Sequence, residues 1–326
     1  MPGFLTHYIA GQAVLGGVAP KIHKKIKNGE RLYNLGAQGP DIFFYYLPGI
    51  IRRRSRNLGG QMHKNDLGIF IARLAYLAKK IKIVERDLLD THCKKYASRD
   101  FLFAYTAGLA MHYLVDVHAH PYVYANVYNE GVPDIKNSAD HRVFETAIDV
   151  ELLKLVRGKR PADYSQWELI HADADQCAVA ARAISNALKQ VYDRNVPAQE
   201  VYQAMRYMSF ATRILRSNRG RRKKWTAVAE NFIVGEPIFS SLVHPQQVDN
   251  DTDYLNRNHT PWSAPWETES HTDSFLDLYN AAVQEGLQLV DALYGYVYED
   301  LSLRSLAAKI GNRSLQTGAP CHLNLW

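Results

Sequence analysis

Apolar residues recur at helical spacing along most of the chain. Between Asp66 and Ile81 they return every three or four positions, which predicts a helix with one buried face. The chain shows no sustained alternation of apolar and polar residues and no Asn-Gly or Asp-Gly hairpin between β-branched runs. The pattern therefore predicts an all-α protein built as a multi-helix bundle.

Capping residues and helix breakers predict where the first helices begin and end. Thr6 can cap a short helix, and Gly39-Pro40 then interrupts the chain. Ser98 can cap a long helix. We place the end of that helix at Pro121, because the residue before a proline avoids the helical region.

The rest of the chain continues the helical pattern. Ser138 can cap a helix that runs to Val156. Irregular loops are expected at 52–60 and 246–270, and further helices at 173–193, 197–217 and 272–299. There is no internal repeat and no low-complexity linker, so we expect residues 1–326 to form a single domain.

The composition excludes several classes of protein. An apolar fraction of 47% is that of a globular chain. No run reaches the roughly 18 apolar residues that span a bilayer, and the first residues lack a secretory-signal pattern, so we expect a cytoplasmic protein. The cysteines, Cys93, Cys177 and Cys321, are widely spaced and predict neither a disulfide framework nor a thiolate metal site. If a metal binds, histidines and carboxylates must hold it.

Positive charge is concentrated in two short clusters. The formal net charge is +6, and much of it comes from Arg52–Arg56 and Arg219–Lys224. Two interpretations stay open. These clusters either solubilise surface loops, or they attract phosphate-bearing substrates and an anionic membrane surface.

The most informative motif lies in the long apolar stretch before Pro121. His112, Asp116 and His120 are four residues apart, so on a helix they form one stripe, from which His118 points away. An unpaired charge in such an apolar setting would be costly. The stretch therefore predicts a buried cluster of polar side chains.

A second pair with the same spacing follows in the next predicted helix. His141 and Glu145 repeat the His-x-x-x-carboxylate pattern, and two adjacent helices can aim both sets at one volume. Spacing alone is weak evidence, because His171 and Asp175 fit it too and such pairs are often surface salt bridges. Buried carboxylates beside imidazoles need a cation, and zinc is the natural candidate for nitrogen and oxygen ligands.

With these motifs in place, the chain resembles the bacterial zinc-dependent phospholipases C. The resemblance covers roughly residues 5–150 and rests on potential zinc ligands in the same order along the chain. They are His7, Asp41 within Gly39-Pro40-Asp41, His63, His112, Asp116, His120, His141 and Glu145. The resemblance implies a helical bundle, shared with the single-strand-specific nucleases, that holds two or three zinc ions in a cleft.

The resemblance also implies a role for each of these side chains. Asp116 would bridge two ions, and Asp41 has a second role as the base that orients or deprotonates the attacking water. The implied ligand sets are His63, His112, Asp41 and Asp116 for one metal, His120, His141 and Glu145 for a second, and His7 with Asp116 for a third.

The sequence departs from the family pattern at two points. Secreted members place the histidine after the bridging aspartate behind the proline, whereas here His120 precedes Pro121; we prefer His120 and keep His118 as the alternative. Secreted members also use a processed N-terminal amine as a zinc ligand. Pro2, exposed by removal of Met1, is the one candidate for that amine.

Clustered zinc ions imply hydrolysis of phosphate esters, with phospholipid-like phosphodiesters as the preferred substrates. Two other functions stay open: a nuclease of the same fold, and a non-catalytic zinc-stabilised protein that binds phosphorylated ligands. The oligomeric state is left open. Aromatic residues near the motifs could line the cleft or serve as packing; they are Tyr45, Tyr46, Tyr122, Tyr124, Tyr128, Trp262 and Trp266.

Overall fold

Helices make up most of the chain in the computed structural model, which describes residues 3–46, 54–81, 94–128, 134–215, 248–249, 251–323 and 325. Within these residues β-type pairing is limited to two isolated bridges, Trp262 with His271 and Arg313 with Pro320. The predicted all-α fold class is confirmed.

The helices follow one another with short connections in the first part of the chain. In order, they are α1 (Phe4–Gly17), α2 (Pro20–Lys27), α3 (Glu30–Gly36), the 3-10 helix η1 (Gly39–Phe44), α5 (Arg54–Lys64), α6 (Leu67–Lys80), α7 (Lys94–Val127), α8 (Asp134–Arg157), η2 (Pro161–Asp163), α9 (Gln166–Ile170), α10 (Ala174–Tyr192), α11 (Ala198–Leu215), α13 (Phe275–Tyr298), α14 (Leu303–Ile310) and η4 (Cys321–Leu323).

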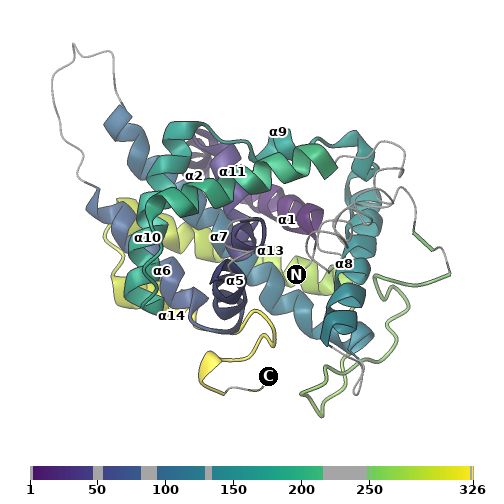
Figure 1. Cartoon of the computed structure of the whole chain (residues 1–326). Coiled ribbons are helices and arrows are strands. Elements are labelled where there is room, and N and C mark those ends of the chain that lie inside the picture. The colour runs from purple at the N-terminus through teal and green to yellow at the C-terminus, as the bar shows by residue number, and fades with distance from the viewer. Residues whose placement is uncertain are drawn as a thin grey trace.

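Helix α7 is the central element of the fold. It packs against α1, α2, α3, α6, α8, α10 and α13, which surround it in Figure 1. Side chains on all sides of α7 are buried, from Leu102 and Phe103 to Tyr122 and Val123. A helix that is apolar all round is expected in the middle of a core. The polar stripe on this helix is therefore carried into the interior of the protein.

Pro121 does not end α7, so the predicted helix end is wrong. The helix starts at Lys94, before the predicted cap Ser98, and it continues through Pro121 to Val127. A proline inside a helix removes one backbone hydrogen bond and costs about 3 kcal/mol. Burial of Tyr122 and Val123 offsets this cost, because only a continued helix brings both side chains into the core.

The structure corrects three other predicted boundaries. Residues 54–60 belong to α5, not to a loop, because Leu58 and Met62 sit one turn apart and bury the same helix face. Helix α1 begins before Thr6, with Gly3 as its N-cap. Helix α8 begins at Asp134, before Ser138.

The described part of the predicted 246–270 loop is irregular but held by hydrogen bonds. The Asn256 amide donates to the carbonyls of Thr260 and Asp273 at 3.0 and 3.1 Å. The side chains of Arg52–Arg56 and the whole of Arg219–Lys224 lie outside the described residues. None of the described helices combines the length and the apolar character that crossing a membrane requires.

Candidate metal centre

Eight side chains, predicted from distant parts of the sequence, meet in three overlapping groups. Within each group the potential ligand atoms lie within 4.8 Å of one another. The groups are His7, His112 and Asp116; Asp41, His63 and His112; and His120, His141 and Glu145. Five imidazoles and three carboxylates thus share one region, and among the described residues no other such group of histidine, cysteine or carboxylate side chains occurs.

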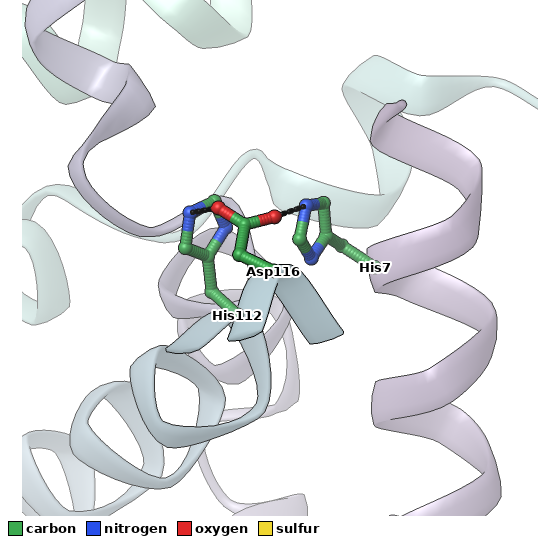
Figure 2. A group of neighbouring side chains, drawn as sticks. All are labelled: His7, His112 and Asp116. Atoms are coloured by element: carbon green, nitrogen blue, oxygen red, sulfur yellow. Dashed lines mark ion pairs between the residues drawn. The ribbon is translucent and has the colours of Figure 1, made fainter. Parts of the chain in front are cut away.

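Asp116 lies at the centre of this arrangement. Its Oδ1 is 3.2 Å from Nε2 of His7, and its Oδ2 is 3.1 Å from Nε2 of His112. Figure 2 shows the carboxylate between the two imidazoles, one on α1 and the other on α7. The two rings stack with centroids 4.2 Å apart. His120, the third residue of the α7 stripe, has Nε2 3.9 Å from Oδ1 of Asp116.

Asp41 and His63 approach from the other side of His112. His63, near the end of α5, has Nε2 3.3 Å from Oδ1 of Asp41 and 3.7 Å from Oδ2 of Asp116. Asp41 lies in the first turn of η1, and Gly39 before it has a positive φ of 52°. The Gly-Pro-Asp motif is explained by this turn, since a Cβ atom at Gly39 would run into the His112 ring.

The third group joins α7 to α8. Glu145 Oε1 is 2.7 Å from Nε2 of His141 and 3.5 Å from Nε2 of His120. His141 and Glu145 are four residues apart on α8, so both side chains leave the same face of that helix. The two His-carboxylate motifs therefore face one volume, as the spacing predicts.

Backbone carbonyls orient three of the imidazoles. A carbonyl oxygen only accepts, so a ring nitrogen facing one must carry the proton. His63 donates from Nδ1 to Gly59 O at 2.7 Å, His112 donates to Ala37 O at 3.2 Å, and His120 donates to Leu315 O. In each case the Nε2 lone pair is directed into the cluster, which is the tautomer that a metal ligand needs.

The residues fit a bound metal, because several buried polar atoms at the centre have no hydrogen-bond partner. Such orphaned atoms are costly unless a cation satisfies them. They are the ring nitrogens of His7, Oδ1 of Asp41, Nε2 of His112, both carboxylate oxygens of Asp116 and Nε2 of His120. Protein groups alone leave these atoms unsatisfied, and nitrogen and oxygen donors of this kind suit zinc.

The electrostatics favour the protonation states that bind cations. Burial lowers the pKa of His141 to about 4, against the opposing effect of Glu145. Burial alone would raise the pKa of Asp116, but His112, His120 and His7 outweigh it and hold that pKa well below its usual value. Burial is likewise outweighed at Glu145, mainly by His141, and its pKa falls. At neutral pH the two carboxylates are ionised and His141 is neutral.

The structure places the two competing histidines in different surroundings. His120 is buried in the cluster, whereas His118 is partly exposed and has Nε2 2.8 Å from Oε2 of Glu285 on α13. Glu285 is also paired with Arg313. His171, whose spacing to Asp175 also fits the motif, stacks on Trp167 at the end of α9 and stays outside the cluster. Met1 and Pro2 lie outside the described residues.

Asp149 is a buried carboxylate at this end of the bundle that the sequence reasoning missed. It accepts hydrogen bonds from the backbone of Leu5 at 2.9 Å, the backbone of Thr6 at 2.7 Å and the Thr6 hydroxyl at 2.6 Å. It thereby caps α1 and fixes the helix that carries His7. The signal was present, since Asp149 extends the His141 and Glu145 spacing by one more turn.

Aromatic side chains flank the third group. Tyr124 has its ring centroid 4.9 Å from His141 and 5.9 Å from His120, and Trp266 packs on Tyr124 at 5.4 Å. Trp262 packs on Tyr122 at 5.4 Å. The irregular segment before α13 therefore reaches the metal-binding end of α7, which the sequence alone does not place.

The fold and the cluster define an all-helical protein with a buried polynuclear metal centre of histidines and carboxylates. Residues 3–229, more than half of the chain, match the family described as zinc-dependent phospholipase C, and the chain belongs to that family. No curated protein and no solved structure gave a significant match. The predicted family membership is confirmed.

Proposed function

We propose that this protein hydrolyses phosphodiesters with a centre of two or three zinc ions, and that its substrates are phospholipids or related phosphate esters. The observation that carries the proposal is the buried cluster of five imidazoles and three carboxylates with orphaned atoms directed at one another. Membership in a zinc-dependent hydrolase family supports the same chemistry.

The geometry supports the assignment of ligands to three metal positions. Asp41, His63, His112 and Asp116 would hold one ion, His120, His141 and Glu145 a second, and His7 with Asp116 a third. Asp116 directs one oxygen at His7 and the other at His112, which suits a carboxylate that bridges two ions. Three ionised carboxylates also supply the negative charge that two or three divalent cations require.

Exposure indicates from which side a substrate would enter. The side chains of His7, His112 and Asp116 are 0% exposed, whereas those of Asp41 and His141 are 8% and 11% exposed. The substrate phosphate would therefore contact the ions from the side of Asp41 and His141. Asp116, enclosed by imidazoles, is placed to organise the centre and not to meet the substrate.

The chain's own residues then have distinct tasks in the reaction. Bound zinc would supply Lewis-acid polarisation of the phosphoryl oxygens and a lowered pKa for the attacking water. Asp41 accepts a hydrogen bond from that water and holds its proton while the phosphorus is attacked. Tyr124 and Trp266 shield the third group from bulk water, which strengthens its electrostatic interactions.

We expect the purified protein to retain at least two zinc equivalents per chain. Elemental analysis of protein never exposed to a chelator checks this, followed by thermal unfolding before and after chelation. Because the ligands are buried and mutually repelling without a cation, chelation should lower the unfolding temperature. Zinc present at 100 times its dissociation constant would stabilise the fold by about 2.7 kcal/mol per site. Fewer than one zinc per chain would refute the polynuclear centre.

A substrate panel tests the activity. We expect slow cleavage of bis-aryl phosphodiesters and of aryl phosphocholine, lost on chelation and restored by zinc. Single-stranded nucleic acid belongs in the same panel, since its preferential cleavage would establish the nuclease alternative. If fully metallated and folded protein cleaves none of these phosphoesters, the proposed hydrolase is wrong and a non-catalytic phosphate-binding protein takes its place. Cytoplasmic location and contact with an anionic membrane stay predictions from the sequence.

A further inference from the structure

The C-terminal segment reaches the metal centre although it lies outside the residues that match the family. Leu315 is fully buried and uses both of its backbone groups there. Its carbonyl accepts the hydrogen bond from Nδ1 of His120, and its N–H donates to the backbone carbonyl of His63 at 2.9 Å. Figure 1 shows this yellow segment beside α5. One residue thus connects two of the three ligand groups.

A tight turn holds Leu315 in this position. The Gly318 N–H donates to Ser314 O at 2.9 Å, and the Ser314 N–H donates to Ala319 O at 2.8 Å. Immediately before the turn, the Arg313 N–H donates to the hydroxyl of Tyr113 on α7 at 2.9 Å. The turn is therefore closed by its own backbone and anchored to the helix that carries His120.

Pro121 creates the space that the turn occupies. Because proline has no N–H, the carbonyl of Val117 has no donor at the usual position four residues on. Gly318 lies against this carbonyl with φ at 69°. A Cβ atom at Gly318 would lie 2.7 Å from Val117 O and 3.5 Å from Pro121 Cγ. Glycine is thus required by the backbone conformation and by the close approach to α7.

We propose that the turn Ser314–Ala319 is a positioning element of the metal centre, which fixes the tautomer and ring orientation of His120 through the Leu315 carbonyl. The proton on Nδ1 leaves the Nε2 lone pair directed at Asp116 and Glu145. A hydrogen bond of this kind to a metal-ligating histidine typically contributes 10- to 100-fold to metal affinity. The inference rests on the metal binding in the proposed function and adds a determinant from outside the family-matched residues.

The test uses two substitutions at Gly318 and a matched glycine. Gly318→Ala and Gly318→Val should push the turn away from Val117, with the larger effect for valine. Gly311→Ala is the control, because Gly311 has a nearly identical φ of 68° but a Cβ there would meet only the Tyr113 hydroxyl at 3.9 Å. The control carries the same backbone strain without displacing the turn.

The first measurement is zinc affinity by competition with a chromophoric chelator. We expect the Gly318 variants to hold one zinc equivalent about 10- to 100-fold more weakly than wild type and Gly311→Ala. A purely structural role for the turn predicts a lower unfolding temperature with unchanged zinc affinity, and that result would overturn the proposal.

The second measurement needs no variant and no metal. In metal-free wild-type protein with nitrogen-15-labelled histidine, NMR should show His120 as the Nδ1-protonated tautomer. A tautomer protonated at Nε2 would contradict the positioning role even if the variants fail to fold. This reading also separates the two proposals, since wild-type protein that binds no zinc but has the Nδ1 tautomer would defeat the metal centre and leave the His120 contact in place.

Discussion

Replacing Asp116 with asparagine should reduce phosphodiester hydrolysis by more than about 100-fold and should release zinc from the protein. Residues that merely support metal ligands typically contribute 10- to 100-fold, so a carboxylate that bridges two ions should contribute more. Asparagine has nearly the same size, but its neutral amide cannot bridge two cations. Its NH₂ group would also face an imidazole nitrogen that is 3.1 or 3.2 Å from the present carboxylate.

The control for Asp116→Asn is the same substitution at Asp291, an exposed carboxylate on α13. Asp291→Asn removes one negative charge from the surface and should leave zinc content and turnover at the wild-type level. Turnover and elemental analysis, each on protein with wild-type circular dichroism, are the measurements. Full metal content and full activity in Asp116→Asn would show that Asp116 is not a ligand.

A comparable loss is expected for His120→Ala, and almost none for His118→Ala. His120 is buried with its Nε2 3.5 Å from Glu145, so its removal takes away one of three side chains around the second metal. We expect the loss of one zinc equivalent and of more than about 100-fold in activity. His118 contacts Glu285, and both side chains are partly exposed, so its truncation should cost at most about 1 kcal/mol of stability.

These two histidines form a matched pair, because they lie on the same helix two residues apart and differ in the direction of the side chain. Zinc content, turnover and unfolding temperature should be measured on both variants in parallel. If His118→Ala released the metal while His120→Ala retained it, the ligand set drawn from the structure would have to be replaced.

Spacing along a helix was enough to predict part of the metal centre. His112, Asp116 and His120 share a face because 3.6 residues complete one turn, and His141 and Glu145 follow the same rule. The same rule would have found Asp149. It could not predict Leu315, since a backbone carbonyl has no signature in the sequence and the contact joins residues 195 positions apart.

The sequence by itself determined the helical class, the polar stripes on two helices and, by resemblance, the identity of all eight side chains in the cluster. These are consequences of residue type and local periodicity. It misplaced the end of α7, because the cost of an internal proline is local whereas the burial of Tyr122 and Val123 that offsets it is tertiary. Only the tertiary structure brought His7, Asp41 and His63 to Asp116 and separated His120 from His118. Those distances depend on how α1, η1 and α5 pack on α7, and packing depends on contacts between residues far apart in the chain.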